Sequence, residues 1–250
     1  MDTLFIADVH LSLTRPEKIT LFKQLLRGPA RQASALYILG DLFDSFWLGT
    51  DDLTPPHPEI LAELKSFSSD GPPLFLVRGN RELLLHDGIE SMTGAVLLPD
   101  LTVINLAGKP VLVAHGDILC SQDTGYQIYR RCLESVPVRW IYPRLPYVLR
   151  NGLVRAVQPA IKQASRNKRP EIMDVDPETV VRTMRDHDVL ELIHGHTHRP
   201  GVHELTIDNK PARRIVLGDW YEEELILVCR NGVRELLSVQ AYLAASRPNG

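Results

Sequence analysis

The stretch Thr3-Leu4-Phe5-Ile6-Ala7-Asp8-Val9-His10 decides the fold, because it joins an apolar run directly to two polar side chains. The run over 3–7 is short and apolar, which is typical of a buried strand in an α/β sheet. Asp8 and His10 follow at the carboxyl end of that strand. Ligands of α/β sheets bind beyond the carboxyl ends of the strands, so this stretch predicts both a sheet and the edge that carries its site.

Four more stretches repeat the arrangement. Short apolar runs at 35–39, 74–77, 111–114 and 190–193 are each followed by a polar cluster. These clusters are Gly40-Asp41-Leu42-Phe43-Asp44, Gly79-Asn80-Arg81-Glu82, His115-Gly116-Asp117 and Gly195-His196-Thr197-His198. Any one of them alone is typical of a turn or a helix cap. Five in order, each beyond a predicted strand, indicate one shared site.

The segments between and after these strands predict the rest of the architecture. Helical spacing over 17–26 and 59–67 separates the first strands, and the segment 123–170 reads as helical and rich in arginine. Further strands are expected at 201–207, 212–217 and 225–228, spaced as hairpins of a second sheet. We therefore expect a two-layer sandwich of sheets flanked by helices, with a core over 1–122 and 171–240, a helical insertion over 123–170 and a tail over 241–250.

Composition narrows the class of protein. The 250 residues are 44% hydrophobic and 24% charged with a net charge of −3, which excludes disordered, collagen-like and disulfide-stapled proteins. Three widely spaced cysteines indicate free thiols of a reducing cytosol. The amino terminus lacks the basic region of a signal peptide, and no stretch approaches the ~18 apolar residues of a spanning helix.

The polar clusters combine Asp, Asn and His side chains, which suits a transition-metal ion. Imidazole and carboxylate ligands together favour Mn²⁺, Fe²⁺ or Zn²⁺ over Ca²⁺ or Mg²⁺ alone. Glycines beside these side chains permit tight turns and close approach of the backbone. The sequence therefore predicts a metal centre at the carboxyl edge of the sheet.

With these five clusters the chain resembles the calcineurin-like metallophosphoesterases, whose pattern is D-x-H, G-D-x-x-D, G-N-H-D/E, H and G-H-x-H. Arg81 stands where most of that family has the histidine of the third motif. Together with HGDILC, IMDV, GHTHRP and RIVLGDW, this departure resembles the UDP-2,3-diacylglucosamine pyrophosphohydrolases of the lipid A pathway. The resemblance covers about residues 1–220. It implies hydrolysis of UDP-2,3-diacylglucosamine to UMP and 2,3-diacylglucosamine 1-phosphate by a metal-activated water.

The resemblance also implies a site, residue by residue. Two Mn²⁺ ions per subunit would be held, the first by Asp8, His10, Asp41 and His198 and the second by Asp41, Asn80, His115 and His196. Asp41 would bridge the ions, and the catalytic set would be Asp41, Asn80, Arg81 and His115. Substrate contacts would be Asn80, Arg81, Asp123, Tyr126, Ser165, Lys168 and His196. Ile161 stands where the resembled family usually has a serine.

The chemistry of the leaving group independently supports a role for Arg81 in the reaction. A departing alkoxide is strongly basic and benefits from an imidazole acid, whereas a departing phosphate needs no proton. A phosphate presents dense negative charge that a guanidinium can hold through two hydrogen bonds. Arg81 therefore favours a pyrophosphate substrate. The alternative is that Arg81 merely pairs with Glu82 or Asp87.

The insertion carries the second indication of function. Residues 135–170 contain no acidic residue and eight basic ones, interleaved with aromatic and aliphatic side chains. This pattern is what an element lying on an anionic bilayer needs, so we expect a peripheral protein on the cytoplasmic face of the inner membrane. In the resembled family the insertion is a lid that encloses the acyl chains and contacts the sugar nucleotide. The alternatives are a solvated helical hairpin and a nucleic-acid contact.

Two other functions remain in view. One is a soluble phosphodiesterase or dinucleoside polyphosphate hydrolase of the same fold, which would gain nothing from an insertion both basic and apolar. The other is a non-catalytic interaction module that has lost its metals. All seven ligand positions are filled here, which argues against such a module. We expect no nucleic-acid partner and no obligate protein partner.

Overall fold

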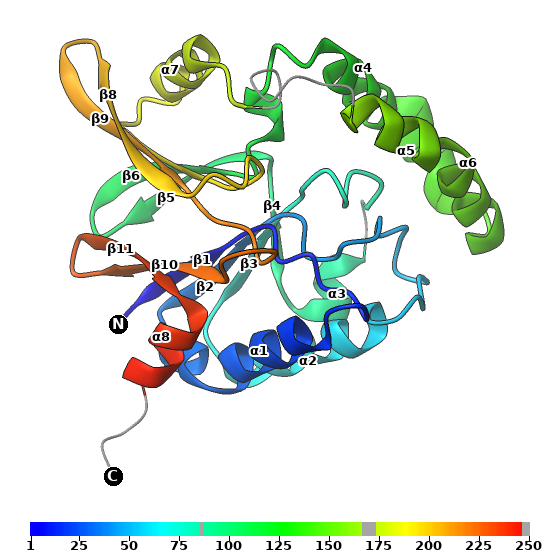
Figure 1. The fold of residues 1–250 in the computed structure, drawn as a ribbon, viewed down its shortest axis with the longest axis horizontal. Coiled ribbons are helices and arrows are strands. Elements are labelled where there is room, and N and C mark those ends of the chain that lie inside the picture. The colour runs from blue at the N-terminus through cyan, green and yellow to red at the C-terminus, as the bar shows by residue number, and fades with distance from the viewer. Residues whose placement is uncertain (86–87, 167–173, 247–250) are drawn as a thin grey trace.

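The computed structural model describes residues 1–85, 88–166 and 174–246, which form two sheets packed face to face (Figure 1). The first sheet has the order β11-β10-β1-β2-β3-β4 and the second β5-β6-β7-β9-β8. The strands are β1 Thr3–Ile6, β2 Ala35–Leu39, β3 Leu74–Val77, β4 Val96–Leu98, β5 Leu101–Leu106, β6 Lys109–Ala114, β7 Glu191–His194, β8 Gly201–Ile207, β9 Lys210–Val216, β10 Leu225–Arg230 and β11 Val233–Ser238. The helices are α1 Pro16–Arg27, α2 His57–Asp70, α3 Ile89–Thr93, α4 Thr124–Leu133, α5 Val136–Ile141, α6 Tyr147–Arg166, α7 Pro177–Asp186 and α8 Val239–Ala245.

Parallel pairing places the functional loops at one edge of the molecule. Strands β1 to β4 pair in parallel in the first sheet, and β6, β7 and β9 pair in parallel in the second. The remaining strands, β5, β8, β10 and β11, pair antiparallel with their neighbours. Because parallel strands end on the same side, the loops that follow β1, β2, β3, β6 and β7 converge.

Alternation along each strand assigns its side chains to two different cores. On β1, Leu4 and Ile6 face the helices, and Phe5 faces the second sheet. The Phe5 ring stacks on that of Tyr37 from the neighbouring strand β2, with ring centroids 4.7 Å apart. This period of two is why a strand buried on both faces reads as a continuous apolar run.

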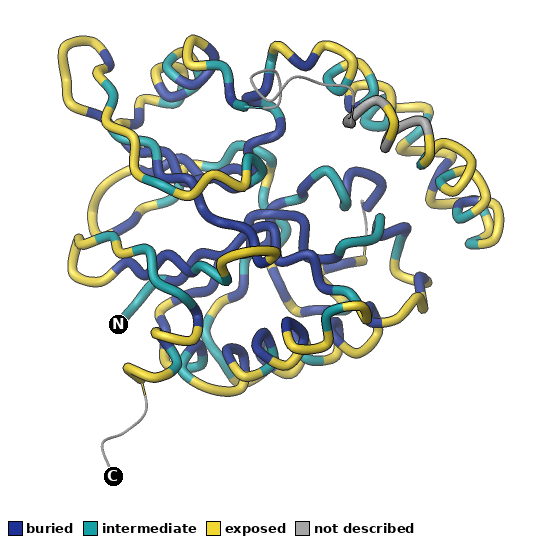
Figure 2. The backbone as a smooth tube through the Cα atoms, in the orientation of Figure 1, coloured by how far each residue is buried: buried dark blue, intermediate teal, exposed yellow. Residues whose placement is uncertain are grey.

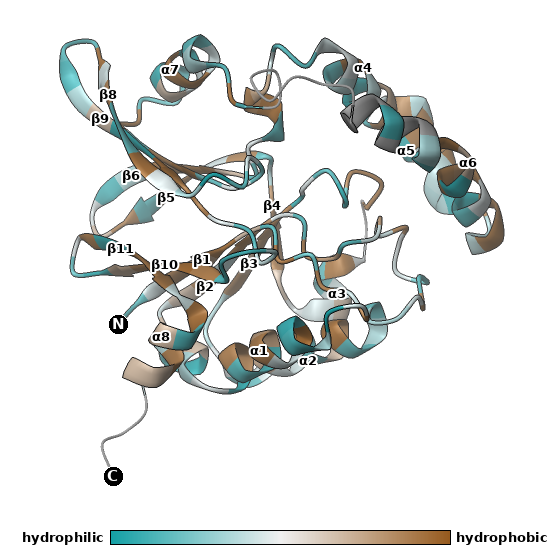
Figure 3. Cartoon of the chain, in the orientation of Figure 1, coloured by the Kyte–Doolittle hydropathy of each residue, from teal (hydrophilic) through white to brown (hydrophobic). Residues whose placement is uncertain are grey.

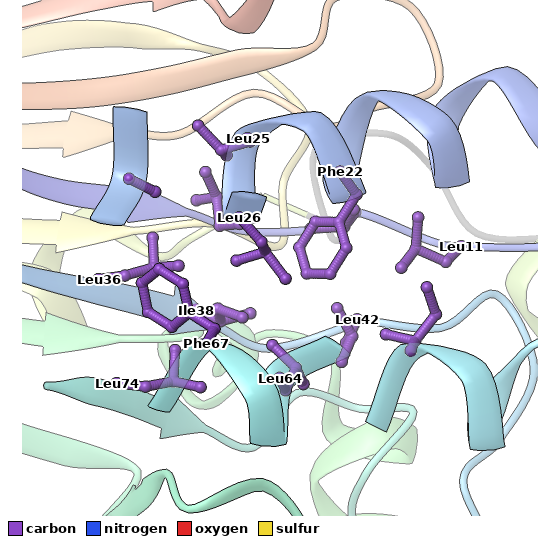
Figure 4. Close-up of a cluster of buried hydrophobic side chains, with 14 of the residues drawn as sticks. Leu11, Phe22, Leu25, Leu26, Leu36, Ile38, Leu42, Leu64, Phe67 and Leu74 are labelled. Atoms are coloured by element: carbon purple, nitrogen blue, oxygen red, sulfur yellow. The ribbon is translucent and has the colours of Figure 1, made fainter. Parts of the chain in front are cut away.

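Three apolar layers hold the fold. The helix layer places Phe22, Leu25 and Leu26 of α1 against Leu36, Ile38 and Leu74 of the first sheet, with Leu64 and Phe67 of α2 beside them (Figure 4). The second layer lies between the sheets. In the third, Val180 and Met184 of α7 pack on Leu112 and Leu192 of the second sheet. Helices α1, α2 and α7 each bury residues three or four apart, the spacing that keeps one helical face on the core.

Helices α4, α5 and α6, which we call the cap, follow one another along one side of the molecule (Figure 1). Figure 2 shows that α5 and α6 are mostly exposed, in contrast to the buried strands. No helix in the part of the chain that the structure describes is long and apolar enough to cross a membrane.

The two sheets and their flanking helices agree with the architecture expected from the sequence, and three details do not. Strands β4, β5 and β11 were not anticipated, because β4 is only three residues long and the other two carry polar residues that interrupt the apolar run. Strand β10 was expected in the second sheet, but it pairs with β1 in the first. The tail expected over 241–250 is helical as far as Ala245, and Tyr242 is buried there and donates a hydrogen bond to Asp2.

Candidate metal centre

The polar clusters that follow five strands meet at one place and form two groups of side chains. In the first group, Nε2 of His198 lies 3.4 Å from Nε2 of His10 and 3.4 Å from Oδ1 of Asp8. His10 Nε2 also lies 3.9 Å from Asp41 Oδ2. Two imidazoles and two carboxylates therefore point toward one another from the ends of β1, β2 and β7.

The second group faces the first across Asp41. Asn80 Oδ1 lies 3.1 Å from Nε2 of His115 and 3.1 Å from Nδ1 of His196, and the two ring nitrogens are 3.2 Å apart. His115 Nε2 lies 3.7 Å from Asp41 Oδ1. The two oxygens of Asp41 are thus turned toward different groups. All seven expected ligands are brought together.

The backbone at these residues is strained. Asp8, His10, Asp41, His196 and His198 all have positive φ, between 49° and 71°, a region that side chains other than glycine seldom adopt. Each such residue costs roughly 1–2 kcal/mol. Strain of this kind persists only where the surrounding structure imposes it, and it is common at functional sites.

Two glycines allow the chain to close around the carboxylates. A Cβ atom at Gly79 would collide with Oδ1 of Asp41, and one at Gly195 would collide with Oδ2 of Asp8. Both glycines lie in the clusters that the sequence singled out. Any side chain at either position would displace a carboxylate from the centre.

The charges of the centre suit a cation. Burial alone would lower the pKa of His115, but the carboxylates of Asp41 and Asp8 outweigh burial and raise that pKa to about 9. Burial lowers the pKa of His10 to about 4 and that of His196 to about 4, so both rings offer a lone pair at pH 7. A divalent cation would compete with protons for these groups.

One buried polar atom supports the fit to a metal ion. Asp8 Oδ1 is buried and accepts no hydrogen bond within the described residues. An unpaired carboxylate oxygen is costly to bury unless a cation or a donor approaches it. Groups Asp8-His10-His198 and Asp8-Asp41-His115 each offer ligand atoms within 4.8 Å of one another. The oxygen and imidazole donors match Mn²⁺, Fe²⁺ or Zn²⁺.

Arg81 lies directly beside the centre. Its Nε is 3.8 Å from Asp41 Oδ2, and its guanidinium lies over the Phe46 ring at 5.4 Å. The alternative pairing with Glu82 is wrong, because Glu82 is buried and accepts hydrogen bonds from the backbone N–H groups of Asp41, Leu42 and Gly79. Asp87 lies outside the described residues. Arg81 is therefore directed at the site.

The expected substrate contacts divide into three sets. Asn80, Arg81 and His196 belong to the centre itself. Tyr126 lies next to it, with its ring centroid 6.4 Å from that of His196, and its hydroxyl donates to Asp117. Asp123 caps α4 by accepting a hydrogen bond from the N–H of Tyr126 at 3.0 Å. Lys168 and the side chain of Ser165 lie outside the described residues.

The analysis of motifs missed two residues that support the centre. Glu82 was considered only as a partner of Arg81, yet it joins the loops that follow β2 and β3. Asp219 lies against His198, with Oδ2 2.9 Å from Nδ1. It follows β9 as Gly218-Asp219, so the rule that identified the other clusters would have found it.

Comparisons with known proteins agree with the geometry. The calcineurin-like phosphoesterase family matches residues 1–200. UDP-2,3-diacylglucosamine hydrolase from Aeromonas hydrophila subsp. hydrophila is 42% identical over 236 residues, which are 94% of this chain and 98% of that protein. The hydrolase of the same name from Enterobacter sp. strain 638 is 43% identical and covers 93% and 97% of the two chains. A solved phosphoesterase from E. coli is 15% identical with a TM-score of 0.47 and covers 96% of this chain and 94% of that one.

Proposed function

The chain belongs to the calcineurin-like phosphoesterases and, within them, to the UDP-2,3-diacylglucosamine hydrolases, and from that premise we propose how its site performs the hydrolysis. The reaction divides the pyrophosphate of UDP-2,3-diacylglucosamine into UMP and 2,3-diacylglucosamine 1-phosphate, a step of lipid A biosynthesis. Two Mn²⁺ ions are the cofactors we propose, one for each group of the centre.

The observation that carries the proposal is the position of Asp41. Its Oδ2 faces His10, and its Oδ1 faces His115, at 3.9 and 3.7 Å. A carboxylate in this position can serve two cations about 3.5–4 Å apart. Asp8, His10 and His198 would complete the first set of ligands, and Asn80, His115 and His196 the second. Cations held by these residues would supply a water of lowered pKa and would neutralise phosphoryl charge.

Arg81 serves the leaving group. Its guanidinium is 26% exposed and lies beside Asp41, where it can reach a phosphate without leaving the centre. The departing phosphate is a weak base, so the arginine contributes charge and orientation rather than a proton. This division of roles suits a pyrophosphate better than an alkyl phosphodiester.

The cap provides the remaining substrate contacts in this proposal. Asp123 caps the start of α4, and the ring of Tyr126 in its first turn lies next to His196, where this end of the helix can border the sugar nucleotide. Ser165 and Lys168 are proposed for the same role from the resemblance alone. The acyl chains would lie along the cap.

We also propose that the cap lies on the cytoplasmic leaflet of the inner membrane. Val136, Trp140 and Val148 are 80%, 61% and 77% exposed, and apolar and polar segments alternate along the cap (Figure 3). Arg139, Arg144 and Arg155 are exposed among them. Arg150, which the sequence placed with these charges, is buried and paired with Asp51, so it is not available to lipid.

The test is an assay of products and of metal dependence. Metal-free protein is incubated with UDP-2,3-diacylglucosamine, a dinucleoside polyphosphate and an alkyl phosphodiester, with and without Mn²⁺. We expect UMP and 2,3-diacylglucosamine 1-phosphate from the first substrate only, and only with the cation. Asp41→Asn should abolish turnover and keep the fold, since asparagine tolerates positive φ. Full turnover in excess chelator, or preference for either other substrate, would contradict the proposal.

A further inference from the structure

The loop that follows β9 touches three of the expected ligands of the first group, although none of its residues is a ligand in the proposal. Asp219 contacts His198, the backbone N–H of Trp220 donates to the carbonyl of Asp8 at 3.0 Å, and the centroid of the Tyr221 ring lies 4.6 Å from that of His10. Trp220 is completely buried, which anchors the loop. The loop therefore fixes one side of the metal centre.

His198 is the imidazole that most needs such support. Its side chain is 34% exposed, whereas those of His10 and His115 are 2% and 1% exposed and are confined by packing. His115 is further oriented by its Nδ1, which donates to the carbonyl oxygen of Leu39 at 2.8 Å. His198 follows a loop at the surface, so only a specific partner can hold its ring.

Asp219 has the geometry of that partner. Its Oδ2 lies 2.9 Å from His198 Nδ1, which leaves Nε2 directed at Asp8 and His10. A histidine that donates Nδ1–H to a carboxylate presents the lone pair of Nε2 to a metal and becomes a stronger ligand.

The carboxylate of Asp219 is itself held in place. Its Oδ1 accepts hydrogen bonds from the N–H groups of Tyr221 at 2.7 Å and Glu222 at 3.1 Å. The residue is 9% exposed. One oxygen is thus bound to the backbone and the other is left for the imidazole, so the carboxylate is oriented before any cation arrives.

We propose that Asp219 is a positioning residue for the first metal site, acting through His198 and not through the second site. The inference rests on the proposed function, because it assumes that His198 binds a cation. Loss of a partner of this kind typically weakens metal binding about 10- to 100-fold. The second group, around His115 and Asn80, has no contact with Asp219 within the described residues and should keep its affinity.

The experiment is a titration of metal-free full-length protein with Mn²⁺. Calorimetry measures the affinity of each site, and electron paramagnetic resonance detects whether the two bound ions are coupled. Wild type should bind two ions and show the signal of a coupled pair. Asp219→Ala should weaken one site about 10- to 100-fold and leave the other unchanged, so that one ion binds without the coupled signal at low Mn²⁺. Asp219→Asn, which keeps an acceptor oxygen but not the charge, should lie between the two. Activity of both variants should recover at high Mn²⁺.

Glu222→Gln is the matched control, because it removes a charge from the same loop without reaching His198. It should bind both ions as wild type does. Unchanged affinity at both sites in Asp219→Ala would overturn the inference. So would equal weakening of both sites with a lower melting temperature of the metal-free variant, because that pattern indicates a structural role. If wild type itself binds no cation, the proposed function fails instead.

Discussion

Arg150 of α6 donates a hydrogen bond to the carboxylate of Asp51 and another to the carbonyl of Leu48, and so ties the cap to the loop that precedes α2. The arginine is only 3% exposed. The same loop contacts Arg81, since the N–H of Trp47 donates to its carbonyl at 3.0 Å. One short segment therefore links the cap to the residue beside the metal centre.

Arg150→Ala should loosen the cap. It removes two hydrogen bonds that a buried guanidinium donates, so we expect the variant to lose about 1–3 kcal/mol of the free energy of unfolding. Hydrogen exchange of backbone amides in the first half of α6 should quicken, and KM for the diacylated substrate should rise more than kcat falls. Arg155→Ala, on the exposed face of the same helix, is the control. Equal rates of amide hydrogen exchange in the two variants would contradict the role of Arg150 in holding the cap.

Arg81→Ala should impair the chemical step. Removing one preorganised donor from a transition state costs about 2–4 kcal/mol, which is a loss of roughly 30- to 900-fold in kcat/KM. The measurement is steady-state turnover of UDP-2,3-diacylglucosamine at saturating Mn²⁺. Arg81→Lys keeps the charge but not the paired donors and should recover only part of the loss. A variant with alanine that retains wild-type turnover would remove Arg81 from the mechanism.

Binding to anionic vesicles should depend on the exposed arginines of the cap. Replacing Arg139, Arg144 and Arg155 with serine should weaken co-sedimentation by about 1 kcal/mol per charge. Wild-type binding should also fall as salt shortens the Debye length from ~10 Å at 0.1 M to ~3 Å at 1 M.

The matched control for the vesicle experiment replaces three exposed basic residues outside the cap, Lys109, Arg182 and Lys210, with serine. It should bind vesicles as wild type does. If both triple variants lose binding equally, net charge and not the cap governs the association. No binding of wild type at low salt would remove the membrane proposal and leave the hydrolysis intact.

Asp52 lies in the loop that precedes α2 and contacts the cap, and it makes the stability of this loop depend on pH. Burial would raise its pKa, but hydrogen bonds from His57 and Thr54 outweigh burial and hold the pKa well below its usual range. A lowered pKa in the folded state means that the stabilisation is present above about pH 4, the pKa of an unfolded aspartate, and is lost as the pH falls further. Chemical unfolding of wild type and Asp52→Asn in chelator should therefore give curves that differ at pH 7 and converge below pH 4. A constant difference would show that the charge of Asp52 is irrelevant.

The sequence predicted the site better than it predicted the cap. A rule about one edge of a sheet was enough to collect the seven proposed ligands, because strand ends and polar side chains are both local features of the chain. The same rule extends to Asp219, because Gly218-Asp219 follows the strand expected over 212–217. A local sequence pattern can locate a site residue whenever the strand that positions the residue directly precedes it in the chain.

Arg150 shows where local pattern fails. In its own segment it is one of eight basic residues with no acidic neighbour, which favoured a position facing lipid. Its partner, Asp51, is 99 residues away in the chain. Burial of that pair depends on how α6 meets a loop from another part of the fold, and no periodicity in either segment reports it. Strands β5 and β11, at the edges of the sheets, were not predicted for a related reason. Their half-exposed positions tolerate polar residues, which interrupt the apolar run that identifies a strand.

The left-handed backbone at the proposed metal ligands sets heat tolerance and catalysis against each other. Glycine would relieve the φ of 50° at Asp8, 49° at His10 and 54° at His198, so such replacements should raise the melting temperature of the metal-free protein. Laboratory evolution toward heat tolerance, without selection for turnover, would therefore erode this centre first. A library screened on both properties should keep Asp and His at these positions and gain its stability elsewhere.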